Sequence, residues 1–310
     1  MSANVLFAAG AAQWAIYEAP LRRALERAGV AARLAREMPP EEVEYIVYAP
    51  DSAVQDFTPF TRARAVLNLW AGVDKIVGNP TLRIPLARMV DHGLTQGMVE
   101  WVCGHALRHH LGMDTHILHQ DGVWRPEAPP LASDRRVSVL GLGALGAACA
   151  RMLAHLGFPV TGWSRGPKAI TGLRCLAGEE GLRRALEKAD ILVLLLPLTL
   201  ETENLLDAAR LALLPPDAVI LNPGRGPLID DGALLAALDA GRLGHATLDV
   251  FREEPLPLAH PFWAHPRVTV TPHIASETRP ESAAEVIAEN IRRGEAGEPF
   301  LHLVDRRAGY

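Results

Sequence analysis

The chain has few of the features that mark secreted, membrane or disulfide-rich proteins. Its three cysteines, Cys103, Cys149 and Cys175, show no C-x-x-C spacing, and an odd number in apolar surroundings predicts buried thiols in a reducing compartment. The longest apolar run, Ile191 to Leu198, is far shorter than the roughly 20 residues of a membrane-spanning helix. The first ten residues carry no basic segment, so we expect no signal peptide. We therefore predict a soluble, cytoplasmic protein with no membrane partner.

Basic residues are not in excess either. The formal net charge is -5, with 31 lysines and arginines against 36 aspartates and glutamates. A nucleic-acid-binding surface needs a basic face, so we expect no nucleic-acid partner. A small anionic substrate is still compatible with this charge, because local basic groups decide that question. The length of 310 residues, with 49% hydrophobic and 22% charged residues, favours an ordinary globular protein of two domains.

Short apolar runs alternate with helical patterns along most of the chain, and this alternation predicts parallel α/β sheets. We expect strands at residues 4–8, 45–48, 65–69, 137–140, 158–163, 191–196, 218–222 and 246–250. A long amphipathic helix is expected near residues 99–111, and a further helix near residues 281–293. The later strands are uniformly apolar, which is typical of a doubly wound parallel sheet covered by helices on both faces.

A glycine-rich turn follows the predicted strand at residues 137–140. In a G-x-G-x-x-G pattern between a strand and a helix, the first glycine permits a tight turn and the second lets the backbone approach a pyrophosphate. The third lets the helix pack on its strand, and the helix N-terminus offers N–H groups to the phosphates. The alternative is a turn that binds no ligand. We assign to a dinucleotide site the residues Gly141, Gly143, Ala144, Leu145 and Gly146.

The end of the next predicted strand lacks the carboxylate that usually holds the ribose 2′-hydroxyl of NAD. Residues 164–168 read Ser-Arg-Gly-Pro-Lys instead. Ser164, Arg165 and Lys168 can hold a 2′-phosphate through charge-assisted hydrogen bonds. We therefore expect NADPH to be favoured over NADH, although a solvated basic loop would contain the same residue types.

Four short segments follow the glycine-rich turn in a fixed order. Residues 196–199, 222–226, 249–256 and 271–275 read LPLT, NPGRG, DVFREEPL and TPHIA. Each could arise by chance, but four in order after a dinucleotide pattern are specific, and together they resemble the D-2-hydroxyacid dehydrogenase family. The resemblance implies a doubly wound (Rossmann) nucleotide domain at residues 107–274. We expect it to be inserted into a flavodoxin-like α/β substrate domain formed by residues 1–106 and 275–310.

The resemblance also implies a catalytic set. Arg225 matches the family's substrate-anchoring arginine, whose planar fork can pair with a carboxylate and polarise the adjacent carbonyl. His273 matches the general acid, and its ordinary pKa of about 6.5 suits proton donation near neutrality. Glu254, rather than its neighbour Glu253, matches the carboxylate that orients the imidazole and favours its charged form. Taken singly, each would be an ordinary surface group. Further expected coenzyme contacts are Pro197, Thr199 and Asp249.

Residues 68–74, NLWAGVD, occupy the place of the family's substrate loop. That loop gives backbone N–H groups to the substrate carboxylate, and Ala71 and Gly72 match it. Trp70 departs from the smaller residue common there, so we expect its indole to narrow the pocket, unless it is a core aromatic. With VD at residues 90–91 and GMVEW at 97–101, the chain resembles the glyoxylate/hydroxypyruvate reductase branch. We therefore expect reduction of small 2-oxo acids to 2-hydroxy acids.

Other interpretations are open at this point. The chain could be a dehydrogenase of a larger D-2-hydroxy acid, or a nucleotide-sensing protein similar to the C-terminal-binding corepressors, which share these motifs. His105 and His109 have an i, i+4 spacing that can bind zinc, but they lack the glutamate of H-E-x-x-H, so we expect no metal. The apolar stripe of the helix near residues 99–111 suits packing between domains or subunits, and we expect a homodimer.

Overall fold

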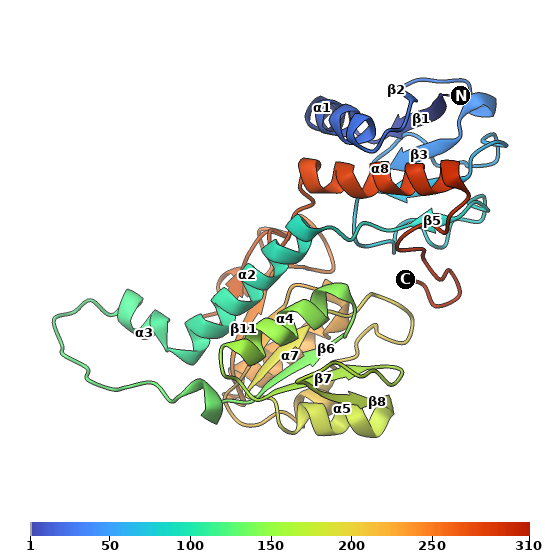
Figure 1. The fold of residues 1–310 in the computed structure, drawn as a ribbon. Coiled ribbons are helices and arrows are strands. Elements are labelled where there is room, and N and C mark those ends of the chain that lie inside the picture. The colour runs from blue at the N-terminus through green and yellow to red at the C-terminus, as the bar shows by residue number, and fades with distance from the viewer. Residues whose placement is uncertain (1) are drawn as a thin grey trace. The chain divides into compact units, whose positions relative to one another are not determined.

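The structure, a computed structural model, describes residues 2–310. It divides into two compact units (Figure 1). The split unit comprises the residues up to Leu94 together with Glu277–Tyr310, and the central unit comprises Thr95–Ser276. Within residues 2–310, every helix is too short or too polar to cross a bilayer.

The split unit is built on a five-stranded parallel sheet in the order β2-β1-β3-β4-β5. Its strands are β1 (Ala3–Ala8), β2 (Ala32–Ala35), β3 (Tyr45–Tyr48), β4 (Ala65–Asn68) and β5 (Leu86–Ala87). The order 2-1-3-4-5 is that of flavodoxin-like sheets, which confirms the predicted class. Alternate residues of β1 face two separate cores, as the pleat of a strand requires: Val5 belongs to one and Leu6 to the other.

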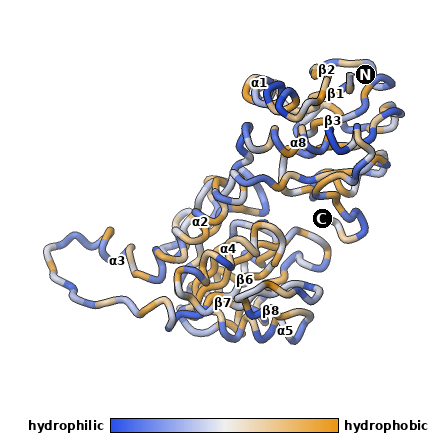
Figure 2. The backbone as a smooth tube through the Cα atoms, viewed as in Figure 1, coloured by the Kyte–Doolittle hydropathy of each residue, from blue (hydrophilic) through white to orange (hydrophobic). Residues whose placement is uncertain are grey.

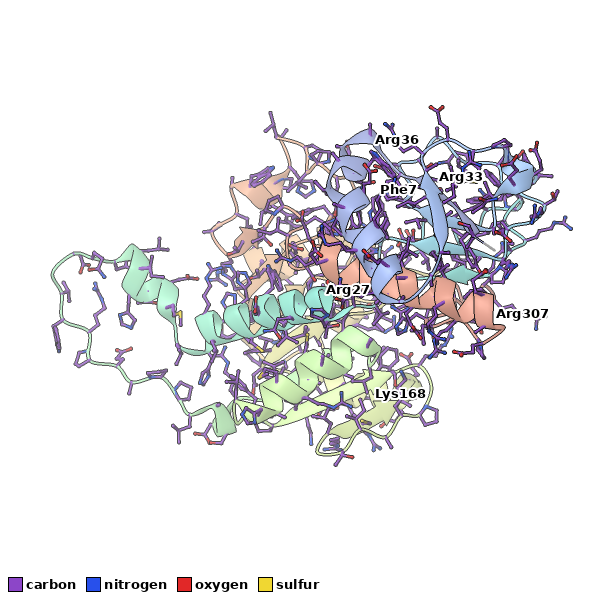
Figure 3. The ribbon with its side chains drawn as sticks, turned by 45° about the horizontal axis from the view of Figure 1, so that its top comes forward. Phe7, Arg27, Arg33, Arg36, Lys168 and Arg307 are labelled. Carbon is purple, nitrogen blue, oxygen red and sulfur yellow. The ribbon has the colours of Figure 1, made fainter. Side chains whose placement is uncertain are left out.

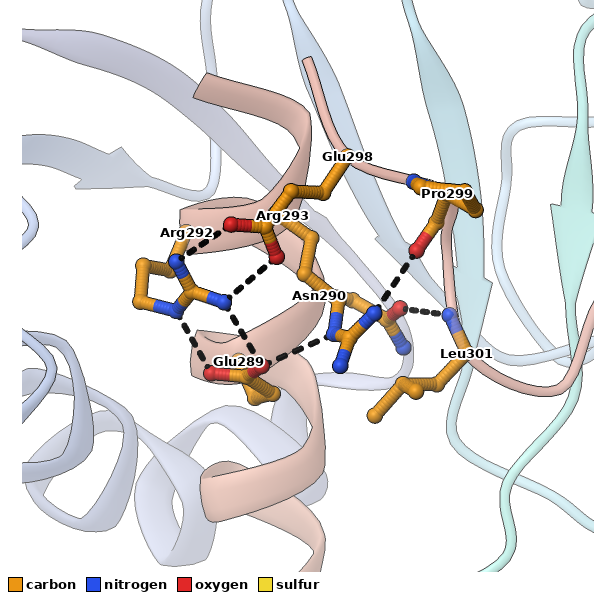
Figure 4. A network of polar contacts seen from close by, with 7 residues as sticks. All are labelled: Glu289, Asn290, Arg292, Arg293, Glu298, Pro299 and Leu301. Carbon is orange, nitrogen blue, oxygen red and sulfur yellow. Dashed lines mark hydrogen bonds and ion pairs between the residues drawn. The ribbon is translucent and has the colours of Figure 1, made fainter. Parts of the chain in front are cut away.

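Two helices from opposite ends of the chain cover one face of this sheet. Helices α1 (Ala11–Arg27) and α8 (Pro280–Ala296) pack against each other, and Leu21 and Ile287 join the core that contains Val5. The turn after α8 is held by a polar network (Figure 4), in which Asn290 Oδ1 accepts the Leu301 N–H at 2.7 Å. The ion pairs of that network join Glu289 to Arg292 and Arg293, and Arg292 to Glu298.

The central unit is built on a seven-stranded parallel sheet in the order β8-β7-β6-β9-β10-β11-β12. Its strands are β6 (Val137–Leu140), β7 (Val160–Ser164), β8 (Arg174–Ala177), β9 (Ile191–Leu194), β10 (Ala218–Asn222), β11 (Leu243–Leu248) and β12 (Val268–Val270). From β6 the chain adds β7 and β8 on one side and β9 to β12 on the other, so the strand order reverses between β6 and β9. Ligands of doubly wound sheets bind outside the carboxyl ends of the strands at such a switch point. The predicted doubly wound class is therefore confirmed, and Figure 2 shows hydrophobic residues along these strands.

The helices of the central unit are α2 (His92–His110, which begins at the unit boundary), α3 (Met113–Leu118), α4 (Ala144–His155), α5 (Gly178–Leu186), α6 (Ala208–Leu211) and α7 (Asp231–Asp239). The chain enters this unit near residue 95, whereas the sequence predicted a boundary at 106. The difference arises because α2 is continuous and its apolar stripe, including Val99, Val102 and Ala106, joins the core around β6. That stripe is thus covered within the chain's own unit.

Candidate active site

The glycine-rich turn joins β6 to α4 at the switch point of the central sheet. Gly141 has φ +104°, a conformation that favours glycine, and a Cβ there would lie 2.3 Å from the Leu195 carbonyl oxygen. A Cβ on Gly146 would lie 1.7 Å from the Gly141 oxygen, so α4 packs directly on the turn. A Cβ on Gly143 would meet no atom within 4 Å. Open space therefore lies beside this backbone at the start of α4, where the N–H groups of Ala144 and Leu145 belong to the first turn of the helix. A helix N-terminus of this kind is able to bind phosphates, and binding at Ala144 and Leu145 stays a prediction.

The loop after β7 places two cations near this turn. The Lys168 ammonium, labelled in Figure 3, donates to the Leu142 carbonyl oxygen at 2.7 Å and so ties the loop to the glycine-rich turn. Arg165 pairs with Glu201 at 2.8 Å, and both side chains are more than half exposed. A phosphate bound by Arg165 would have to compete with this carboxylate. The chemistry of these groups fits a 2′-phosphate, since residues 164–168 contain no acid.

The other predicted coenzyme residues near this edge are held by bonds within their own loops. The Ser164 hydroxyl donates to the Gly166 carbonyl oxygen at 2.8 Å. In the segment after β9, the Thr202 hydroxyl accepts the Thr199 N–H at 2.8 Å and donates to the Pro197 carbonyl oxygen at 2.7 Å. Because β9 and β6 are neighbouring parallel strands, this segment and the glycine-rich turn emerge at the same edge of the sheet.

His273 and Glu254 form a hydrogen-bonded pair at the carboxyl ends of β11 and β12. The Nδ1–H of His273 donates to Glu254 Oε2 at 2.6 Å, and Glu254 Oε1 accepts the Phe251 N–H at 2.9 Å. The hydrogen bond to Glu254 raises the pKa of His273, although burial acts in the opposite direction. Burial favours a higher pKa for Glu254, but the bonds from His273 and Phe251 outweigh it and the pKa is lowered. The pair therefore favours a charged imidazolium, with Nε2 as the remaining proton-donating atom.

Asp249 braces the loop that carries His273. Its buried carboxylate accepts the Thr271 hydroxyl at 2.6 Å and the N–H groups of Ile274 and Ala275 at 2.9 and 2.8 Å. Its backbone oxygen accepts the His273 N–H at 2.8 Å. These bonds hold His273 at φ +53°, a left-handed conformation that costs a non-glycine residue about 1–2 kcal/mol. The carboxylate is thus engaged in shaping the site, and a direct coenzyme contact from Asp249 stays a prediction.

Arg225 lies on the loop after β10, the next strand of the sheet. Asn222, at the buried end of β10, donates to the Arg225 carbonyl oxygen at 2.9 Å and accepts the Gly224 N–H at 3.1 Å. The positive charge of Arg225 opposes protonation of His273 and helps to lower the pKa of Glu254, as expected of neighbouring groups. Three strand ends therefore bring together the three predicted catalytic side chains.

Trp70, Ala71 and Gly72 follow β4 in the split unit. Asn68, the last residue of β4, donates from Nδ2 to the Trp70 and Gly72 carbonyl oxygens at 2.7 and 3.1 Å. The Trp70 side chain is half-buried against the core of that unit, and the Lys75 ammonium lies 5.9 Å from its ring centroid. The indole therefore has a packing role of its own.

His109, one of the two histidines with the zinc-like spacing, belongs to a partly buried cluster. The rings of His109 and His245 lie at a tilt of 42° with their centroids 4.8 Å apart, and they bond through Nε2 to the hydroxyls of Thr247 and Thr269 at 2.9 and 2.8 Å. Burial, and then repulsion from His245, lowers the pKa of His109 to about 3. Burial, and then the charge of Arg108, lowers the pKa of His245 to about 4. Over residues 2–310, no three His, Cys, Asp or Glu side chains are grouped to hold a metal ion.

Sequence reasoning did not identify Asn68 and Asn222, which hold the loops after β4 and β10. The signal was a polar amide at the end of an otherwise apolar strand: the two strands read AVLN and AVILN. Buried amides form hydrogen bonds, and at a strand end the partners nearest in sequence are the backbone groups of the following loop.

Comparison with known sequences places these features in a family. The sequence model described as D-isomer specific 2-hydroxyacid dehydrogenase, NAD binding domain, matches residues 103–275. Glyoxylate/hydroxypyruvate reductase A of Serratia proteamaculans is 42% identical over 257 residues, which is 80% of this chain and 82% of that protein. The Yersinia enterocolitica protein of the same name is 41% identical over 255 residues, with the same coverage.

Comparison with solved structures gives relatives of the same family. A D-isomer specific 2-hydroxyacid dehydrogenase from Xanthobacter autotrophicus Py2, crystallised with NADPH and MES, is 43% identical with a TM-score of 0.93 over the whole of both chains. An NADPH-dependent glyoxylate/hydroxypyruvate reductase from Sinorhizobium meliloti, in complex with NADP and sulfate, is 34% identical with a TM-score of 0.84, again over both whole chains.

Proposed function

The chain belongs to the family of D-isomer specific 2-hydroxyacid dehydrogenases, and on that premise we propose that it reduces glyoxylate, hydroxypyruvate and similar small 2-oxo acids with NADPH. The observation that carries this proposal is the 2.6 Å bond between His273 and Glu254 beside Arg225. It combines a proton donor for the carbonyl oxygen with a cation for the carboxylate. The names of the reductases from Serratia and Sinorhizobium support the choice of substrate.

The catalytic residues divide the work of a carbonyl reduction. Arg225 binds the substrate carboxylate through its planar fork and polarises the adjacent carbonyl group. His273 donates the Nε2 proton to the carbonyl oxygen as this becomes a hydroxyl, and Glu254 keeps the imidazole oriented and charged beforehand. Bound NADPH would supply the hydride for C2 of the substrate. The neutral His273 then regains a proton from solvent.

The two units have different roles in this proposal. In the central unit, the backbone at Gly143 and the start of α4 bind the pyrophosphate, while Ser164, Arg165 and Lys168 bind the 2′-phosphate. Pro197, Thr199 and Asp249 complete the coenzyme site. In the split unit, the N–H groups at Ala71 and Gly72 bind the substrate carboxylate, and Trp70 limits the size of the acid.

The deciding experiment follows the loss of absorbance at 340 nm with glyoxylate, hydroxypyruvate and a series of larger 2-oxo acids, each with NADPH and NADH. We expect the highest kcat/KM for the two small acids with NADPH. Arg165→Asp should reverse or abolish the preference for NADPH, because it replaces the phosphate's cation by an anion. Turnover of larger acids alone would overturn the substrate assignment. Binding of NADPH without any turnover would indicate a nucleotide sensor.

We also propose a homodimer, working in the cytoplasm, that is formed through the segment after α2. This segment, residues 111–131, extends from the central unit (Figure 1) and leaves large apolar side chains uncovered: Trp124 is 90% exposed and Leu118 74%. A second copy of the chain would cover this surface. Light scattering should give the mass of a dimer for the wild type and of a monomer for Trp124→Asp combined with Leu118→Asp. A monomeric wild type would overturn this proposal.

A further inference from the structure

Asn68 ends strand β4 where the chain turns into residues 70–72. The strand is buried throughout, and the Asn68 side chain is only 1% exposed. Burying an amide is unfavourable unless it forms hydrogen bonds. One terminal atom of the side chain lies 2.7 Å from the Trp70 carbonyl oxygen and 3.1 Å from the Gly72 carbonyl oxygen. Because both neighbours are acceptors, that atom has to be the amide nitrogen.

These two bonds set the direction of two peptide groups. In a planar trans peptide the N–H points opposite to the carbonyl of the preceding residue. With both carbonyls turned toward Asn68, the N–H groups of Ala71 and Val73 point away from it. The Trp70 carbonyl oxygen also accepts the Met89 N–H at 3.1 Å, which holds the first of these peptides from a second side. These two peptides thus present the N–H groups of Ala71 and Val73 on the side away from Asn68, and Ala71 is one of the two residues assigned above to the substrate carboxylate. Oriented backbone N–H groups of this kind can bind anions.

The other end of the Asn68 amide shows that the residue is not optimal for stability alone. Its Oδ1 atom is buried, and among the described residues it has no hydrogen-bond partner. A buried acceptor without a partner is destabilising. The equivalent residue of the central unit, Asn222, uses both ends of its amide. What Asn68 contributes is therefore the donor that orients the loop.

We propose that Asn68 is a positioning residue that preorganises the loop at residues 70–72 to bind the carboxylate of the 2-oxo acid. The inference rests on the proposed function and adds to it a residue that governs substrate affinity. Without the two bonds from Asn68, the Trp70 and Gly72 peptides can rotate, and binding has to order them. Asn68 acts on the affinity for the 2-oxo acid, whereas proton transfer from His273 and coenzyme binding do not depend on it.

The test compares steady-state constants for three variants. Asn68→Ser keeps a single, shorter donor and adds no charge, while Asn68→Asp keeps the shape and removes both donor hydrogens. We expect the KM for glyoxylate to rise about tenfold in the first variant and more in the second, with kcat and the KM for NADPH changed less than about twofold. Asn79→Asp is the matched control, because Asn79 Nδ2 also donates to a loop carbonyl of the split unit, that of Gln55 at 2.8 Å. This control should leave the KM for glyoxylate unchanged.

A binding measurement separates positioning from general damage. Calorimetric titration of the NADPH complex with oxalate, which cannot be reduced, should show affinity lost in Asn68→Ser by the same factor as the KM rises. An unchanged KM for glyoxylate, or an equal rise in the KM for NADPH, would overturn the inference alone, provided that the wild type reduces glyoxylate. A wild type that neither reduces glyoxylate nor binds oxalate would overturn the proposed function, and the role of Asn68 with it.

Discussion

Two groups of histidines in the central unit show how partner and exposure determine what an imidazole can do. His273 is half exposed and donates to a carboxylate, and this bond raises its pKa. His109 and His245 are partly buried, lie next to each other and bond to threonine hydroxyls, and their pKa values fall to about 3 and 4. One residue type therefore favours its charged form in one place and its neutral form in the other. A hydrogen-bonded carboxylate raises the pKa of an imidazole, as in His273, whereas burial and a neighbouring histidine lower it, as in His109.

The largest expected difference between the two groups is catalytic. His273→Ala removes the proposed proton donor, so kcat for glyoxylate reduction should fall by about 10²–10⁴-fold. His245→Asn removes an imidazole that has no part in the chemistry, so kcat should change less than about twofold. Both constants come from the absorbance assay at 340 nm. A similar loss of kcat in both variants would contradict the proposal that His273, and not His245, takes part in the reaction.

Glu254→Gln tests whether the carboxylate of Glu254 is what raises the pKa of His273. In the wild type the pKa of His273 is raised, so reduction should persist above pH 6.5 and fall as pH rises through that higher value. The glutamine removes the main cause of the raised pKa and leaves the opposing charge of Arg225. The descending limb of the pH–rate profile should therefore move to lower pH, and kcat at pH 7.5 should fall about tenfold or more. Superimposable profiles for the two proteins would contradict this role of Glu254.

The His109–His245 pair should make the protein sensitive to acid. The pKa values of His109 and His245 are lowered in the folded state, so the unfolded chain binds more protons between about pH 6.5 and the folded values near 4 and 3. The free energy of unfolding should therefore decrease as pH falls through this window, by up to about 1.4 kcal/mol per pH unit for each histidine. Urea unfolding at a series of pH values measures the slope. His109→Gln should make it shallower, and an unchanged slope would show that His109 is protonated in the folded protein.

The ion pair of Arg165 with Glu201 is more exposed than either histidine group, and its effect should be the smallest. Glu201→Gln removes the carboxylate that competes for Arg165, so NADPH should bind about two- to threefold more tightly, an effect typical of solvent-exposed ion pairs. Fluorescence titration with NADPH measures the affinity. Glu203→Gln is the control, since Glu203 lies on the same segment and pairs with Arg252 at 3.8 Å. Weaker NADPH binding in Glu201→Gln would show that Glu201 supports the site.

Much of the fold could be predicted because its central strands are continuous apolar runs. Strands β3, β6 and β10 occupy the predicted residues and are buried at every position. Strand β11 begins three residues earlier than the predicted strand at 246–250, because Gly244 and His245 interrupt the apolar pattern. Strands β2, β5, β8 and β12 were not predicted, and all four lie at the edges of their sheets. Burial is only partial in β2, β8 and β12, whereas β5 is buried but only two residues long.

Residues of the candidate site could be predicted where they stand in a short motif of recognisable sequence. His273, Glu254 and Arg225 each stand in such a motif, and each follows the end of a strand. The supporting contacts were not predictable, because they depend on distances between loops that are far apart in the chain. Asp249 reaches residues 271–275 across more than twenty positions. Asn68 and Asn222 end apolar strands, but the sequence does not show how the following loops turn toward their amides.

Helix α8 has a consequence for the order in which the protein can be made. The core of the split unit contains Leu21 near the start of the chain and Ile287 near its end, and the whole of Thr95–Ser276 lies between them. At about 5–20 residues per second, a ribosome needs roughly ten seconds or more to translate that stretch. Throughout that time the first sheet has emerged without the helix that covers it, while the central unit, contiguous in sequence, can already fold. The nascent chain therefore carries an uncovered apolar face that chaperones can bind, and the split unit is completed last.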